Sequence, residues 1–132
     1  MITIDASIAL AWYLEPQNPF AQAALDAVID RGGAIPGNFE SEVVHVLLVN
    51  ERRQRSTAFQ TLRALEELRD LTLLVTTPPL SLIADLARRH ALSGYDAGYL
   101  AVAIERAAPL ATLDQQLAEA ARREHALWAG PQ

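Results

Sequence analysis

The chain has 132 residues and 51% hydrophobic content, which predicts one globular domain over residues 1–132 rather than a disordered chain. Its formal net charge of −5 at pH 7 argues against a continuous basic surface around nucleic acid. All 11 basic residues are arginine and cysteine is absent, which excludes catalysis by a lysine amine or a thiol, disulfides and thiolate metal sites.

Short apolar runs alternate with longer segments whose apolar residues recur every three or four positions. The apolar runs predict strands at 2–4, 34–36, 73–75 and 109–112, with a last short strand at 126–128. The periodic segments predict helices at about 7–14, 19–31, 40–53, 57–69, 81–90, 95–107 and 114–123. This alternation predicts an α/β fold in three layers, a central and mostly parallel sheet flanked by helices on both faces.

Membrane segments and secretion signals are not expected. No apolar run reaches the roughly 20 residues that a membrane-spanning helix needs. The N-terminus also lacks the basic start of a secretory signal. We therefore expect a cytoplasmic protein without membrane contact.

Two predicted strands are followed closely by an aspartate, Asp5 after the first and Asp114 after residues 109–112. In parallel sheets, ligands bind beyond the carboxyl ends of the strands, where these two side chains would lie. Either aspartate can instead cap the helix that follows, because its carboxylate accepts hydrogen bonds from the first free amides. For each residue alone, capping is the simpler explanation.

Two further acids lie on predicted helices. Asp96 stands three positions after Ser93, where an acid suits the first turn of a helix that Ser93 caps. Glu42 lies beside the apolar Val43 and has no arginine three or four positions later. For Glu42 alone, a solvated helix surface is an equally good explanation.

Considered jointly, four converging carboxylates need a positive partner. One pair of like charges 4 Å apart repels by roughly 4 kcal/mol at an effective dielectric constant near 20. Mg²⁺ or Mn²⁺, which prefer oxygen ligands, fit this donor set. Zinc does not, because cysteine is absent and His45, His90 and His125 lack ligand spacing. Of these histidines only His45, one helical turn from Glu42, is of interest.

Four segments together resemble the PIN-domain nucleases, specifically the VapC toxins of bacterial toxin–antitoxin pairs. The segments are IDASIALAWYL around Asp5, IPGNFESEVVHVLL around Glu42, LSGYDAGYLAVA around Asp96 and LATLDQQLAEAA around Asp114. They follow the family's order and approximate spacing over nearly the whole chain. One departure is His45, because many relatives have asparagine at this position.

The resemblance implies a metal-dependent endoribonuclease toxin that hydrolyses RNA phosphodiester bonds with Mg²⁺ or Mn²⁺. It implies that Asp5 and Asp96 hold the principal ion. Asp114 would bind this ion directly or through water, or help to hold a second one. Glu42 would complete the cluster and orient the attacking water.

The resemblance also identifies neighbours and partners of this cluster. Ser7 and Thr112 would help to orient ligands. Three arginines are weaker candidates for binding phosphates beside the cut, although a solvated helix face explains each of them equally well: Arg52, Arg53 and Arg55. The implied partners are a VapB-type antitoxin, the RNA substrate and a second copy in a homodimer, with a hetero-oligomer on operator DNA as a further assembly.

Two alternatives stay open. The first is a catalytically silent PIN-fold binding module that acts through its antitoxin and operator complexes. The second is a phosphotransfer domain such as a receiver or a haloacid-type phosphatase. The second is disfavoured, because Ser7 stands where its second acid belongs, two residues after Asp5, and because the chain has no lysine.

Overall fold

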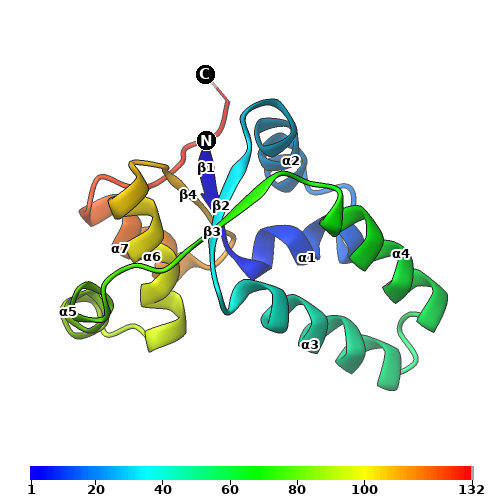
Figure 1. Ribbon diagram of the computed structural model, residues 1–132. Coiled ribbons are helices and arrows are strands. Elements are labelled where there is room, and N and C mark those ends of the chain that lie inside the picture. Colours follow the sequence, from blue (N-terminus) through cyan, green and yellow to red (C-terminus); the bar gives the residue numbers. More distant parts are fainter. Residues whose placement is uncertain (132) are drawn as a thin grey trace.

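The computed structural model describes residues 1–131; residue 132, the last of the predicted domain, lies outside the described residues. In the described part, four strands and seven helices are present (Figure 1). The strands are β1 (Ile2–Ile4), β2 (Gly33–Pro36), β3 (Leu73–Thr76) and β4 (Leu110–Ala111). The helices are α1 (Ala6–Leu14), α2 (Pro19–Arg31), α3 (Phe39–Arg52), α4 (Ala58–Arg69), α5 (Leu80–His90), α6 (Gly94–Arg106) and α7 (Gln115–Arg123).

The strands form one parallel sheet in the order β3-β2-β1-β4. Helices α1 to α4 lie on one side of this sheet and α5 to α7 on the other (Figure 1). The predicted three-layer α/β class is therefore confirmed. Because every strand runs in the same direction, all carboxyl ends lie at one edge, the usual place for ligand sites in such sheets.

The helices begin where the sequence offers a capping side chain. Asn18, Thr57 and Ser93 each accept a hydrogen bond from an amide in the first turn of the helix that follows. Thr57 forms a complete capping box with Gln60. A capping residue is not counted as part of the helix that it caps. Several observed helices therefore differ by one residue from the predicted bounds.

The core lies around β1 and the adjacent α6. All three residues of β1 are buried, and α6 is buried without interruption from Ala97 to Ala103. Small side chains along this part of α6, including Gly98, allow the helix to approach the sheet closely. The first turn of α6 thereby reaches the carboxyl edge of the sheet. Within residues 1–131, no helix combines the length and the apolar character that crossing a membrane requires.

The prediction of a last strand at 126–128 is wrong. Leu127 forms only an isolated parallel bridge with Leu110. The Leu110 amide donates to the Ala126 carbonyl at 2.7 Å, and the Leu110 carbonyl accepts a hydrogen bond from the Trp128 amide at 2.9 Å. The partner strand β4 has two residues, because Pro109 before it has no amide hydrogen to donate. Gly130 and Pro131 then prevent a longer ladder.

Candidate active site

Asp5 lies at the junction of β1 and α1 and is only 5% exposed. Its Oδ1 accepts hydrogen bonds from the Ser7 hydroxyl at 2.6 Å and the Ile8 amide at 3.3 Å, and its Oδ2 accepts one from the Thr112 hydroxyl at 2.5 Å. Burial raises the pKa of the Asp5 carboxyl to about 6, against the opposing effect of these hydrogen bonds, and the negative charge of Asp114 adds to the rise. Asp5 therefore caps α1 and also carries a negative charge that burial disfavours.

The same hydroxyls tie the end of β1 to the end of β4. Ser7 Oγ accepts a hydrogen bond from the Leu113 amide at 3.0 Å, and Thr112 Oγ1 accepts one from the Asp114 amide at 3.0 Å. Since β1 pairs directly with β4, these bonds fix the backbone of Asp114 beside Asp5. Ser7 and Thr112 thus lie where they orient the carboxylate of Asp5.

Asp114 also neighbours Asp96. Asp114 caps α7 through the Leu117 amide at 3.0 Å and remains exposed. Asp96 lies in the first turn of α6, whose cap is Ser93. Partial burial raises the pKa of the Asp96 carboxyl, and the charge of Asp114 raises it further. The charge of Asp114 thus raises the pKa of both Asp5 and Asp96.

Tyr99 links Glu42 to this group. Glu42 lies in the first turn of α3 and accepts a hydrogen bond from the side-chain amide of Asn38. Tyr99 is 1% exposed, and burial raises the pKa of its hydroxyl strongly, with further increases from the charges of Glu42 and Asp5. Its hydroxyl makes no hydrogen bond that meets ordinary geometric limits.

Sequence reasoning missed Tyr99, which is a buried phenol among acids. A buried aromatic residue on an apolar helix reads as ordinary core. The available signal was its spacing: Tyr99 follows Asp96 by one helical turn, so both side chains lie on neighbouring parts of the same helix face. Asp5, Asp96 and Asp114 are thus connected by their charges, and Tyr99 is the residue that senses the charges of both Glu42 and Asp5.

The donor chemistry of this neighbourhood fits a divalent cation. None of the ion pairs found in residues 1–131 involves Asp5, Glu42, Asp96 or Asp114, so their charges lack a basic partner there. The ligand atoms that the four acids offer are all carboxylate oxygens, and such sets suit Mg²⁺ or Mn²⁺. As the side chains stand, however, no three Asp, Glu or His residues of the described chain are placed to hold one ion.

His45 lies one helical turn from Glu42, whereas the three predicted arginines lie far from the acids. His45 is exposed on α3. The arginines Arg52, Arg53 and Arg55 are exposed at the far end of α3, and Arg52 is about 15 Å from Glu42 along the helix axis at 1.5 Å per residue. The structure does not bring these arginines to the acids, and a role in phosphate binding stays a prediction.

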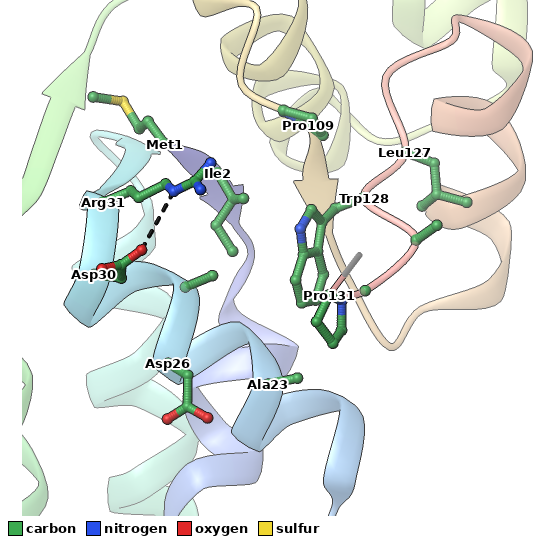
Figure 2. A pocket seen from close by; sticks show the side chains of 13 residues that line it. Met1, Ile2, Ala23, Asp26, Asp30, Arg31, Pro109, Leu127, Trp128 and Pro131 are labelled. Carbon is green, nitrogen blue, oxygen red and sulfur yellow. Dashed lines mark hydrogen bonds and ion pairs between the residues drawn. The ribbon is translucent and has the colours of Figure 1, made fainter.

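A pocket without any of the four acids lies at the opposite edge of the sheet, where β1 and β4 begin. This pocket of about 720 Å³ is lined by residues at the amino ends of β1 and β4, by α2 and by the C-terminal segment with Trp128 (Figure 2). Its ion pair, between Asp30 and Arg31 at 3.3 Å, is exposed on both sides. None of the four acids lines it.

The hydrogen bonds of Thr112 predict a clear difference between two buried threonines. Thr112→Val is expected to lower the free energy of unfolding by about 1–3 kcal/mol, because Asp5 loses a donor and the Asp114 amide an acceptor. Thr76→Val is the matched control, since the Thr76 hydroxyl is equally buried but has no partner. Urea unfolding at pH 7 compares them; equal losses in both variants would contradict the assigned network.

The raised pKa of Asp5 predicts that metal-free protein loses stability as pH rises. Between the ordinary pKa of 3.8 and the folded value of about 6, the folded state binds more protons than the unfolded state. The free energy of unfolding therefore falls through this window, by about 3 kcal/mol at 1.36 kcal/mol per pKa unit. Urea unfolding in EDTA from pH 4 to 7 measures it, with Asp5→Asn as reference; parallel profiles of the two proteins would contradict the prediction.

Comparisons with known proteins agree with this fold. PAE2754 from Pyrobaculum aerophilum has a similar structure, with a TM-score of 0.67 and 23% identity, over 90% of this chain and 83% of that chain. FitAcB from Neisseria gonorrhoeae is also similar, with a TM-score of 0.56 and 20% identity, over 92% of this chain and 94% of that chain. No curated protein matches the chain. Residues 2–123 match the PIN domain, so the chain belongs to the PIN-domain family, whose members are generally nucleases.

Proposed function

We propose that the protein is a metal-dependent endoribonuclease toxin of the VapC type, which hydrolyses RNA phosphodiester bonds and is neutralised by a VapB-type antitoxin. The observation that carries the proposal is the position of Asp114, whose charge raises the pKa of both Asp5 and Asp96. None of these three acids has a basic partner among the described ion pairs. Membership of the PIN-domain family supports hydrolysis of a nucleic acid. One PIN domain over residues 1–132 and a cytoplasmic location are part of this proposal.

Asp5, Asp96 and Asp114 are the residues that would hold Mg²⁺ or Mn²⁺. When bound, such an ion supplies a water of lowered pKa and stabilises the leaving oxygen. Ser7 and Thr112 favour the ionised form of Asp5 and fix its carboxylate by donating to both oxygens. At neutral pH, a folded pKa of about 6 leaves Asp5 mostly ionised.

Glu42 is the proposed residue for orienting the attacking water. The side-chain amide of Asn38 donates to one of its carboxylate oxygens, and the carboxylate would accept a further hydrogen bond from the water. The buried hydroxyl of Tyr99 lies within the electrostatic reach of Glu42 and is available as a donor. We therefore add Tyr99 to the proposed site as a positioning residue for Glu42.

The proposed partners need apolar contact surfaces. Phe59 and Leu62 on α4 are large apolar side chains that remain exposed. Such residues are typical of protein interfaces, which supports α4 as a surface for the homodimer or the antitoxin. A hetero-oligomer of toxin and antitoxin on operator DNA completes the proposed set of assemblies.

The experiment that tests the proposal is a metal-dependent cleavage assay. Purified protein is incubated with a mixture of long single-stranded RNA and, separately, with DNA of the same sequence. Cleavage of the RNA is expected with Mn²⁺ or Mg²⁺ and none with EDTA, because the acids repel the substrate phosphate without a cation. Equal cleavage in EDTA would contradict the metal requirement, and cutting of the DNA alone would contradict the substrate class.

One observation favours a silent binding module as the second candidate. No three acidic or histidine side chains within residues 1–131 are placed to hold one ion. A protein of this kind would bind its antitoxin but would leave RNA intact with either metal. Absence of cleavage at saturating Mn²⁺, in a sample that binds its antitoxin, would favour this candidate.

A further inference from the structure

A pocket of about 410 Å³ lies beside the acids, at the carboxyl edge of the sheet. The ends of β2 and β3, the start of α5 and the first turns of α6 form its walls. Its volume is within the usual range for small-molecule sites. Its apolar walls come from Pro36, Pro78, Leu80, Ile83 and Tyr95.

Two elements connect this pocket to the proposed catalytic site. Asn38 lines the pocket and donates a hydrogen bond to Glu42. On α6, the pocket-lining residues Gly94, Tyr95 and Gly98 share one face of the helix that carries Asp96 in its first turn. A group in the pocket would therefore lie near the acids, joined to Glu42 through Asn38, without contacting Asp96 itself.

The rim of the pocket carries exposed apolar side chains. Tyr95 is 68% exposed and Leu80 is 81% exposed, so neither contributes much to the core. A tyrosine ring in this position offers a flat face on which a nucleobase can stack. Gly94 has no atom within 4 Å of the position of a Cβ, which leaves space beside the ring.

The wall also contains polar groups without complete partners. Thr76 is 3% exposed, lines the pocket, and its hydroxyl has no hydrogen-bond partner within the described chain. The side-chain oxygen of Asn38 faces Gly98, at 3.8 Å from the position of an added Cβ. A hydroxyl and an amide can donate and accept hydrogen bonds at the edge of a base.

We propose that this pocket binds one nucleobase of the RNA, adjacent to the phosphate that is cut. Tyr95 stacks on the base, and Thr76 and Asn38 bind its edge, so the pocket determines which base stands beside the cleavage position. This inference rests on the proposed ribonuclease function. A base fits better than an apolar side chain of a peptide partner, because the side chains of Asn38 and Thr76 offer hydrogen-bonding groups that only a polar occupant can use.

The first test uses the pocket alone. Adenosine, guanosine, cytidine and uridine are titrated separately at millimolar concentration into the ¹⁵N-labelled full chain, since small ligands without a phosphate need no metal. At least one nucleoside is expected to shift the amide signals of Gly94 and Gly98. If no nucleoside shifts these signals, the proposal is wrong, whether or not the protein cleaves RNA.

Variants of the aromatic residue provide the control. Tyr95→Ala is expected to weaken binding of that nucleoside about 5- to 10-fold, the low end of the range for loss of one stacked base. Tyr95→Phe keeps the ring and is expected to bind almost as wild type. Ile29→Ala removes a similarly exposed apolar side chain, 67% exposed, from α2 and is expected to change nothing. Equal binding by Tyr95→Ala and wild type would overturn the proposal.

The second test maps cleaved ends in an RNA of mixed sequence. Wild type is expected to show a preference for the base that binds in the titration, and Tyr95→Ala to lose it with KM raised more than kcat is lowered. Thr76→Val is expected to relax the preference without lowering Tm, because its hydroxyl has no partner to lose. A purely structural role would lower Tm and leave the preference intact.

The two tests separate the pocket from the chemistry. Cleavage by wild type with an unchanged base preference in Tyr95→Ala would overturn the base-binding pocket and leave the ribonuclease standing; the apolar walls would then favour a peptide side chain as occupant. Nucleoside binding that depends on Tyr95, in a protein that cuts no RNA, would support the pocket and contradict the proposed ribonuclease.

Discussion

Asp96→Asn is expected to reduce metal-dependent RNA cleavage about 100-fold or more, which corresponds to about 3 kcal/mol in the activation barrier. The variant replaces a carboxylate of the proposed metal site by a neutral amide of the same shape. The backbone amide of Asp96 donates to the Ser93 hydroxyl, and an interaction of the Asp96 carboxyl with Ser93 lowers its pKa against the larger effect of burial; asparagine keeps the backbone contact. Loss of activity is therefore expected without loss of the fold.

The matched control for this variant is Asp26→Asn. Asp26 is an exposed aspartate on α2, on the other face of the sheet from α6. The same loss of one charge is expected to leave cleavage within about twofold of wild type. Initial rates with Mn²⁺ and a fluorescent RNA, together with circular dichroism of each variant, measure the comparison. Equal rates for Asp96→Asn and wild type would remove the nuclease assignment.

The metal-free protein is expected to melt about 5–10 °C below its form with saturating Mg²⁺ or Mn²⁺. A ligand at 100 times its Kd stabilises the folded state by about 2.7 kcal/mol, and roughly 4 °C per kcal/mol applies to a chain of this size. The repulsion among Asp5, Asp96 and Asp114 supplies the physical reason, because a cation removes it.

Asp96→Asn is expected to raise the metal-free Tm by a few degrees and to reduce the shift that the metal causes. The variant removes one carboxylate from the repelling group and one ligand from the ion. Differential scanning calorimetry in EDTA and in Mn²⁺ gives both numbers, with Asp26→Asn again as the control. Melting curves that do not change in either comparison would argue strongly against a shared cation.

The order of the elements was predictable because its signals are local. Capping side chains such as Thr57 and Ser93 mark helix starts, and the buried run Ile2–Ile4 marks the central strand. The strand at 126–128 was predicted wrongly because its formation depends on a partner strand more than ten residues away. Pro109 limits the length of β4 locally, but the pairing of β4 with a later segment is a tertiary property.

The acids show that a capping interpretation and a functional one do not exclude each other. Asp5 and Asp114 both cap helices, as the simpler explanation predicted, and both bear charges that interact at the carboxyl edge. A residue between a parallel strand and a helix can cap that helix and also lie at the carboxyl edge of the sheet, where ligands bind. The metal-binding roles of the four acids stay predictions: Asp114 raises the pKa of Asp5 and of Asp96, and Glu42 is connected to them only through Tyr99.

Other features of the site were outside the reach of sequence patterns. The proposed base-binding pocket joins Thr76 on β3 to Tyr95 on α6, which only the sheet order and the helix positions bring together. Such proximities depend on packing between elements rather than on any local periodicity.

Mn²⁺ bound to the crystalline protein, located by its anomalous scattering, tests the central claim most directly. The expected result is a peak at the carboxyl edge of the sheet, with oxygen atoms of Asp5 and of Asp96 or Asp114 as ligands and Glu42 nearby. The same crystals of Asp96→Asn are expected to show a weaker peak or none. A protein saturated with Mn²⁺ elsewhere, with no peak among these acids, would contradict the claim.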